Sequence, residues 1–327
     1  MIPRPVQWRA LNGVVLLDKP VGLTSNQALQ AVRRLFGASK GGHTGTLDPF
    51  ATGVLPLCLG EATKFSADLL NANKSYVATA CFGSRTDTGD LTGDVVETTP
   101  HLPTPAALEA VLAQFAGDTE QIPPMYSALK RDGQPLYKLA RAGIEVEREP
   151  RKIHLNQLAW SNVTCNAQGG VVSADLAVRC SKGTYIRTLA EDMARAAGSL
   201  AHLVALRRTR VGEVSLDGCK TLAALVAESV ALNPEPATLT VEQLGAAGLL
   251  QSVDFLVQNL QRLDITDRQA VLCRHGNPFL PDAGQNLPVG TILRFYLADR
   301  FIGVGQVVAE QKDVKIQPVR LVSTENS

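Results

Sequence analysis

The alternation of apolar and polar positions predicts strands and helices mixed along the first two thirds of the chain. Residues 13–17 form an apolar run that ends at a turn, and apolar side chains then recur on one helical face over 25–36. Further patterns predict strands over 74–82 and 171–180, a helix over 105–115, and a helix over 185–197 that Thr184 caps and Gly198 ends. The segment 121–149 begins with prolines and continues with basic residues, which indicates a long basic arm whose start is too proline-rich for regular structure.

The pattern changes after residue 220. Residues 221–260 are rich in Ala and Leu and are interrupted by Pro234 and Pro236, which predicts two helices around a break. Short β-like runs follow between 263 and 322, notably 291–297 and 301–308. This terminal region is therefore expected to form a small all-β domain.

Composition places the chain among globular proteins. Its 327 residues suffice for two domains, and 45% of them are hydrophobic. No apolar stretch approaches the roughly 20 residues of a membrane span, and the start lacks a leader pattern, so we expect a cytoplasmic protein. The six cysteines form no Cys-x-x-Cys pair and the five histidines no zinc-ligand spacing, so neither disulfides nor a metal is expected.

The charge is neutral overall but unevenly distributed. The net charge is +1, yet residues 151–210 hold nine basic and three acidic side chains, whereas 211–250 hold one basic and five acidic. A basic surface for a polyanion and an ordinary solvated surface are equally compatible with this distribution.

The glycine-rich segment 41–53 is the first candidate for chemistry. Pro49 disfavours helical geometry at Asp48, and apolar neighbours would partly desolvate its carboxylate, which a nearby cation could keep ionised for nucleophilic or base catalysis. An ordinary Asp-Pro turn is the competing interpretation. A phosphate-binding loop over 37–44 is rejected because His43 stands where that motif requires lysine.

Three further side chains are candidates on their residue type and position. Tyr76 and Tyr185 begin predicted elements and could stack on a displaced base, although core packing is the commoner use of such rings. Arg187 in the first turn of its helix could pair with a carboxylate, or could simply lie on the surface.

Several motifs occur together in a recognisable order. The segment 42–53 resembles the active-site signature of the TruB family of tRNA pseudouridine synthases. Residues 16–25, 86–90, 121–130, 183–187 and 206–208 resemble further motifs of that family, and the region after 260 is similar to a PUA-type RNA-binding domain. The resemblance covers about residues 12–210 and is weakest over 221–260.

The resemblance implies a fold and a domain division. The fold would be α+β, with a mixed, largely antiparallel central sheet flanked by helices and a small C-terminal all-β PUA-like domain. Residues 1–220 would form the catalytic domain with an RNA-gripping insertion at 121–149, residues 221–260 a helical connector, and residues 261–327 the PUA-like domain.

It also implies an activity: isomerisation of uridine 55 in the T-loop of tRNA to pseudouridine, without cofactor or metal. Asp48 would act at the ribose as nucleophile or base, Arg187 would pair with it, and Tyr76 would stack on the flipped uracil and move a proton. The substrate would also be bound by His43, Tyr185, Leu206 and Lys19, with His43 supporting the gap that the base leaves. The expected partner is the T-loop and T-stem of tRNA, bound by a monomer without a membrane or an obligate protein partner.

Two alternatives remain open. A non-catalytic RNA-binding or RNA-folding protein would need a basic surface but not Asp48. A guide-RNA-dependent relative acting on ribosomal RNA would work through protein partners, and no additional interaction segment is visible in the chain.

Overall fold

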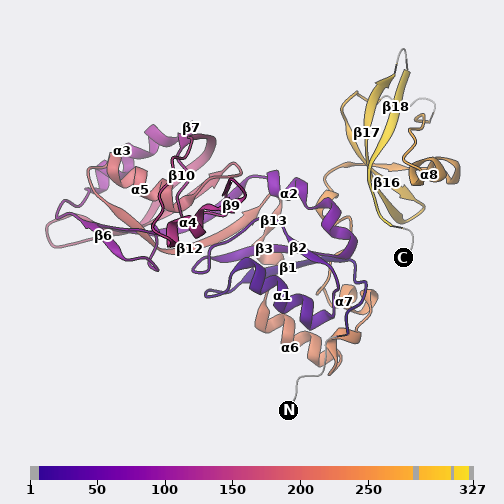
Figure 1. Cartoon of the computed structure of the whole chain (residues 1–327), viewed down its shortest axis with the longest axis horizontal. Helices are drawn as coiled ribbons and strands as arrows, with labels where there is room; N and C mark the ends of the chain where they lie inside the picture. Colours follow the sequence, from indigo (N-terminus) through magenta and orange to yellow (C-terminus); the bar gives the residue numbers. More distant parts are fainter. Residues whose placement is uncertain (1–6, 283–286, 311–312, 324–327) are drawn as a thin grey trace.

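A mixed ten-stranded sheet forms the centre of the larger part of the molecule (Figure 1). The computed structural model describes residues 7–282, 287–310 and 313–323. The strands of this sheet are β1 (Gly13–Lys19), β2 (Gly41–His43), β3 (Thr52–Leu59), β4 (Lys74–Phe82), β7 (Gly117–Gln121), β10 (Arg151–Cys165), β11 (Val171–Cys180), β12 (Ala201–Val211), β13 (Val214–Ser215) and β14 (Lys220–Thr221). They follow the order β14-β1-β3-β12-β4-β11-β10-β7, with β2 beside β3 and β13 beside β12.

Most neighbouring strands in this sheet are antiparallel. The described parallel pairs are β1 with β14 and β3 with β12. Two small hairpins lie outside the sheet: β5 (Ser84–Thr86) with β6 (Val95–Thr98), and β8 (Lys130–Arg131) with β9 (Gln134–Pro135). The predicted mixed, largely antiparallel sheet is therefore confirmed.

Local sequence signals set the ends of several helices. The helices of this part are α1 (Ser25–Phe36), α2 (Ala67–Asn71), α3 (Pro105–Phe115), α4 (Leu136–Arg141), α5 (Ile186–Ala196), α6 (Leu222–Leu232) and α7 (Val241–Ala246), with short 3-10 turns η1 (Gly60–Phe65), η2 (Leu216–Gly218), η3 (Pro236–Thr238) and η4 (Phe255–Val257). Thr24 and Gln27 form a reciprocal capping box on α1, and Thr104 caps α3. The predicted helices over 25–36 and 105–115 and the strands over 74–82 and 171–180 are confirmed at the same residues.

The main core lies between the sheet and helices on one of its faces. Alternate residues of β1, Val15 and Leu17, pack with α1, while Val14 and Leu16 belong to a second buried cluster on the opposite face. Residues of α3 and α5 cover the same face as α1 farther along the sheet. The connector also contributes to this core through residues such as Leu225 and Leu244. It therefore packs as part of the larger unit.

One local expectation was wrong, and one central strand was not predicted. Thr184 does not cap α5, because its hydroxyl donates to the Ser181 carbonyl and Tyr185 is the N-cap residue without a side-chain cap bond. Strand β12, at the middle of the sheet, had no predicted counterpart. Its buried Arg208 and its two further arginines interrupt the apolar alternation by which strands are recognised.

A smaller four-stranded sheet forms the C-terminal part (Figure 1). It has the order β15 (Gln261–Asp264), β16 (Ile292–Leu297), β17 (Arg300–Glu310) and β18 (Asp313–Leu321). One helix that the sequence pattern did not predict, α8 (Asp267–Arg274), packs on this sheet through Ala270 and Cys273. The predicted small β domain is thus confirmed with an added helix.

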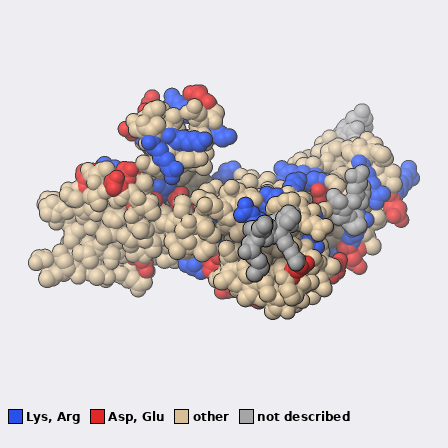
Figure 2. Space-filling model, turned by 60° about the horizontal axis from the view of Figure 1, so that its bottom comes forward, with Lys and Arg blue, Asp and Glu red and all other residues tan. Residues whose placement is uncertain are grey.

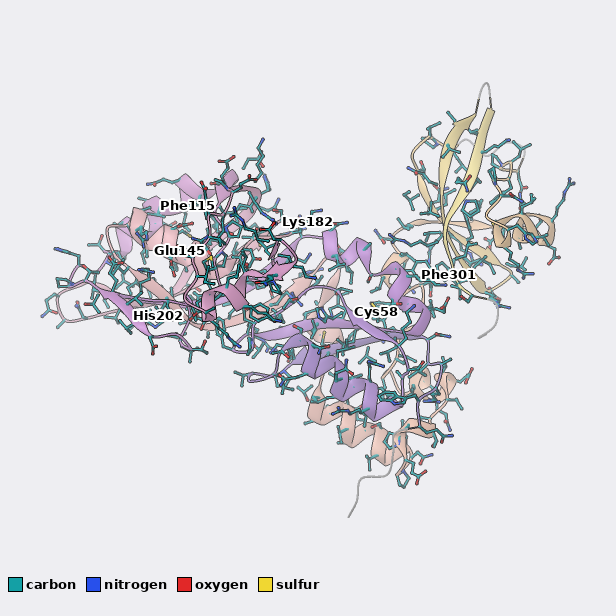
Figure 3. All side chains as sticks on the ribbon, viewed as in Figure 1. Cys58, Phe115, Glu145, Lys182, His202 and Phe301 are labelled. Atoms are coloured by element: carbon teal, nitrogen blue, oxygen red, sulfur yellow. The ribbon has the colours of Figure 1, made fainter. Side chains whose placement is uncertain are left out.

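The C-terminal sheet contacts the larger part at η1. The rings of Phe65 and Phe301 meet edge to face, 5.1 Å between centroids, and Figure 3 shows Phe301 on the side of the C-terminal sheet that faces the rest of the chain. The Lys64 ammonium donates to the Leu321 carbonyl at 3.0 Å, and Glu61 accepts from the backbone N–H of Ser323 at 2.6 Å. Among the described helices, none is both long and apolar enough to cross a membrane.

Candidate active site

A pocket of about 310 Å³ opens where the loop carrying Asp48 meets the start of β4, the residue after β11 and the middle of β12. The start of α5 and the first residues of the 121–149 arm form its other walls. The lining includes Asp48, Tyr76, Tyr185, Arg187 and Leu206, together with residues 126–129 of the arm. Five predicted residues from distant parts of the chain therefore lie around one cavity.

Arg187 and Asp48 form the polar centre of this pocket. Nε of Arg187 lies 3.0 Å from Oδ2 of Asp48, and the arginine side chain is 5% exposed whereas the aspartate side chain is 35% exposed. Asp48 is thus the accessible partner of a buried cation. The predicted pairing is present, and it orients the carboxylate while leaving part of it open to the pocket.

Three other groups fix the Arg187 guanidinium. Its Nη1 donates to the Thr88 carbonyl and lies 3.5 Å from Oδ2 of Asp90, and its Nη2 donates to the Tyr126 carbonyl at 2.8 Å. Asp90 in turn accepts from the Thr92 N–H at 2.9 Å through Oδ1. One arginine therefore ties together the Asp48 loop, the 87–94 turn and the arm.

The electrostatics of the pocket act on the Asp48 carboxyl in opposing directions. Burial raises the pKa of Asp48 above its ordinary value of 3.8, and the Arg187 cation lowers it again. Asp90 adds a second raising contribution and Lys19 a small lowering one. The pKa stays raised, so ionisation of Asp48 depends on its cationic neighbours.

Arg208 holds the Asp48 loop from the sheet side. Its side chain is buried, and its Nε donates to the Val54 carbonyl at 2.8 Å and its Nη2 to the Gly45 carbonyl at 3.2 Å. Gly53 pairs with Arg208 across β3 and β12 and has φ +107°, and a Cβ there would lie 2.1 Å from the Arg208 carbonyl oxygen. The close approach of the two strands therefore requires glycine at 53.

Lys19 lies beneath the same loop and outside the pocket lining. Its side chain is 0% exposed, and its ammonium donates to the carbonyls of Pro20 at 2.8 Å, Leu23 at 2.6 Å and Pro49 at 3.4 Å. Burial lowers the pKa of Lys19 to about 8. Lys19 was expected to bind the substrate, and the structure places its ammonium against the backbone next to Asp48.

Of the remaining predicted residues, Tyr76, Tyr185 and Leu206 line the pocket and His43 does not. The hydroxyl groups of Tyr76 and Tyr185 have pKa values raised by burial, as is usual for aromatic rings set in a pocket wall. His43 lies on β2 outside the pocket lining, paired with Leu57. Its Nδ1 is buried and has no hydrogen-bond partner within the described part of the chain.

Three residues that no sequence pattern singled out also contribute to the site. Asp90 and Arg208 act on Asp48 and its loop as described above, and Ser127 of the arm lines the pocket and is only 5% exposed. Asp90 lies in a Gly/Thr/Asp stretch that predicts only a turn. The sequence signal for Asp90, Arg208 and Ser127 was their position within the segments 86–90, 206–208 and 121–130, which resemble family motifs. Their residue types alone did not indicate a role in the site.

Three of the nine basic residues in the stretch 151–210 are buried or half-buried. Arg187 and Arg208 are buried in the site, and Arg207 is paired with Asp18 at 2.7 Å. The six other basic residues of the stretch are exposed: Arg151, Lys152, Arg179, Lys182, Arg195 and Arg210. Figure 2 shows further Lys and Arg side chains along a projection, in the part of the molecule where Figure 1 places α4. The residues that the structure describes include no group of three or more His, Cys, Asp or Glu side chains that could hold a metal ion.

Comparison with known structures identifies the class of fold. A chain from the "Crystal Structure of a Cbf5-Nop10-Gar1 Complex" aligns with a TM-score of 0.66 over 97% of this chain and 87% of its own length, at 25% identity. A chain from the "Structure of H/ACA RNP bound to a substrate RNA containing 2'-deoxyuridine" aligns with a TM-score of 0.68 over 99% and 89%, at 21% identity. The fold is that of pseudouridine synthases, as predicted.

Sequence comparison then specifies the family. Residues 33–186 match "TruB family pseudouridylate synthase (N terminal domain)" and residues 187–254 match "tRNA pseudouridylate synthase B C-terminal domain". Proteins called tRNA pseudouridine synthase B are 48% identical in Dechloromonas aromatica, over 91% of this chain and 92% of theirs, and 55% identical in Bordetella avium, over 73% and 96%. The chain belongs to the TruB family of pseudouridylate synthases. The predicted family and enzyme class are confirmed.

Proposed function

We propose that this protein isomerises uridine 55 in the T-loop of tRNA to pseudouridine, with Asp48 as the catalytic carboxylate and without a cofactor. The observation that carries the proposal is the 3.0 Å contact between Arg187 Nε and Asp48 Oδ2, in a pocket whose lining includes Tyr76 and Tyr185. A cation-paired, partly desolvated carboxylate is the group that this chemistry needs.

The reaction rearranges bonds within one nucleotide. The bond between N1 of uracil and C1′ of ribose breaks, the base turns, and C5 bonds to C1′. The C5 proton is then lost and N1 gains a proton, so the atoms balance without a redox partner. Asp48 acts at the ribose, either as a nucleophile at C1′ or as a base on the sugar, and its ionised form is required for both roles.

The pocket suits a single extruded base. Its volume of about 310 Å³ is at the small end of the range for ligand pockets. Stacking on Tyr76, with Tyr185 and Leu206 on other walls, would offset part of the unstacking cost of a few kcal/mol. His43, which lies on β2 outside the pocket lining, is proposed to support the space that the base vacates.

Two further surfaces are proposed to bind the rest of the tRNA. Within the arm over 121–149, the stretch 130–141 carries four exposed basic residues and a single acidic one, which suits contact with phosphates. The C-terminal sheet, proposed as a PUA-like domain over 261–327, is joined to η1 through the contacts of Lys64 and Phe65. Residues 1–220 are then the catalytic domain and 221–260 its connector.

The relatives favour tRNA over guide-directed ribosomal RNA as the substrate. Proteins called tRNA pseudouridine synthase B are 48% and 55% identical, whereas the two chains from ribonucleoprotein complexes are 21% and 25% identical. A purely RNA-binding role is less well supported, because such a role would not require the Asp48–Arg187 pair.

Release of tritium from C5-labelled uridine in tRNA tests the proposal. We expect release by purified protein without added metal or nucleotide, and complete loss in Asp48→Asn with tRNA binding within roughly threefold of wild type, because a residue that acts in the transition state affects turnover more than binding. Full activity of Asp48→Asn would refute the mechanism. Equal turnover of tRNA and unstructured RNA would refute T-loop recognition.

A further inference from the structure

Gln121 makes a two-point contact with the backbone of a pocket residue 64 positions away. The backbone N–H of Tyr185 donates to Oε1 of Gln121 at 2.8 Å, and Nε2 of Gln121 donates to the Tyr185 carbonyl at 3.0 Å. Gln121 is the last residue of β7 and is only 4% exposed. Both polar ends of its amide are therefore satisfied by one residue of the site.

This contact replaces a cap that α5 lacks. Tyr185 is the N-cap residue of α5, and its side chain makes no capping hydrogen bond. In a capping box the N3 side chain would bind the N-cap N–H, but position N3 of this helix is Thr188, which is too short for that exchange. Gln121 supplies the acceptor from a distant strand instead.

The first turn of α5 presents the residues that the reaction is proposed to use. Tyr185 lines the pocket, and two positions later Arg187 pairs with Asp48. Residue 126 of the arm contacts the same turn through its carbonyl, which accepts from Arg187 Nη2 at 2.8 Å. The arm thus begins with two contacts to this helix start, and Gln121 makes the first of them.

We infer that Gln121 is a positioning residue for catalysis, which sets Tyr185 and Arg187 against Asp48 and ties the base of the RNA-gripping arm to the reacting centre. The inference rests on the proposed function. Since misplacement of catalytic groups by about 1 Å can cost on the order of a hundredfold in rate, loss of this contact is expected to act on turnover more than on tRNA binding.

The test compares Gln121→Met with a matched control, Gln114→Met. Methionine has nearly the length and volume of glutamine but cannot make either hydrogen bond. Gln114 lies on the exposed side of α3 and outside the pocket. Tritium release is measured for wild type, both methionine variants and Asp48→Asn. For each protein kcat and KM for tRNA are determined over a range of pH, at temperatures below its unfolding temperature.

We expect Gln121→Met to lower kcat roughly tenfold to a hundredfold while KM changes less than about threefold. We also expect its acid limb to move to higher pH. The charged groups facing Asp48 are Arg187, Asp90 and Lys19, and a displaced Arg187 would lower the Asp48 pKa less. Gln114→Met should match wild type in all three measurements.

Other results would overturn the inference. A Gln121→Met kcat and acid limb equal to those of Gln114→Met would show that the contact does not position catalytic groups. A deficit that disappears on cooling and follows the melting temperature would show a role in stability alone. An inactive wild-type protein would overturn the proposed function and this inference with it, whereas an active wild type with unaffected Gln121→Met would overturn the inference alone.

Discussion

Arg187 and Asp48 form an unequal pair, in which a buried guanidinium meets a carboxylate that stays partly open to the pocket. Nε of Arg187 lies 3.0 Å from Oδ2 of Asp48. The same guanidinium also lies 3.5 Å from a second carboxylate, that of Asp90. One cation is therefore shared between two anions, and burial of an uncompensated charge is costly. The protonation of Asp48 should consequently depend on Asp90, although the two carboxylates come from different loops.

The first prediction concerns the acid limb of activity. In the proposed mechanism the ionised form of Asp48 is the active one, and its pKa is raised by burial and by Asp90, so the rate should fall as pH drops through that raised pKa. Asp90→Asn removes a contribution that raises this pKa. The acid limb should therefore move to lower pH, measured as single-turnover rate against pH.

Asp94→Asn is the control for this experiment. Asp94 lies in the same turn with an exposed side chain and does not contribute to the raised pKa of Asp48. The Asp94 variant should keep the wild-type profile. A shift of the Asp90→Asn limb to higher pH would contradict the charge sharing, whereas a lower plateau rate would not, because Asp90 also orders the turn through Thr92.

The second prediction concerns Gly53, where two strands approach too closely for a side chain. In Gly53→Ala the new Cβ would lie 2.1 Å from the Arg208 carbonyl oxygen, and φ of +107° is strained for any residue with a Cβ. The free energy of unfolding should fall by at least about 2 kcal/mol. Activity should also be lost, since the same strand pair carries the Asp48 loop.

Gly42→Ala in the same motif is the matched control. The nearest atom to a Cβ at Gly42 is a methyl carbon of Thr63 at 3.9 Å, an ordinary contact, and no positive φ is present. Urea denaturation should separate the two variants, with Gly42→Ala within about 0.5 kcal/mol of wild type. Equal destabilisation of both would show that the β3·β12 approach tolerates a methyl group.

Sequence predicted those parts of this molecule whose signals are local. Thr24 with Gln27 and the apolar face of 25–36 define α1 without reference to any other element. By contrast, Tyr185 begins α5 with support from Gln121, 64 residues away, and the nearby Thr184 was therefore a false signal. A contact between residues so far apart in the sequence produces no periodic pattern of apolar and polar positions from which it could be predicted.

The candidate site was likewise predicted only in part. Motif order brought Asp48, Tyr76 and Arg187 together correctly around one pocket. It could not tell which side of the backbone a side chain occupies. Lys19 was expected to bind the substrate, whereas its buried ammonium contacts backbone carbonyls outside the pocket lining. Arg208 was counted as surface charge although it is buried in the middle of the sheet. Burial of a charged residue depends on partners that only the fold brings together.

The third prediction concerns Lys19, whose ammonium donates to the backbone carbonyls of Pro20, Leu23 and Pro49. Lys19→Met leaves these acceptors without their donor, which should cost about 1–3 kcal/mol of stability. Because Pro49 follows Asp48 directly, the carboxylate should also lose its fixed position. We expect kcat to fall at least roughly tenfold with KM for tRNA nearly unchanged.

Lys40→Met serves as control, because the Lys40 side chain is exposed. Both variants remove one positive charge, so a general electrostatic effect on tRNA binding would appear in both as a higher KM. A substrate contact by Lys19 would instead raise KM in Lys19→Met alone and leave kcat near wild type. That outcome would restore the role expected from the sequence, whereas a fall in kcat confined to Lys19→Met would establish that the buried ammonium acts through the backbone that carries Asp48.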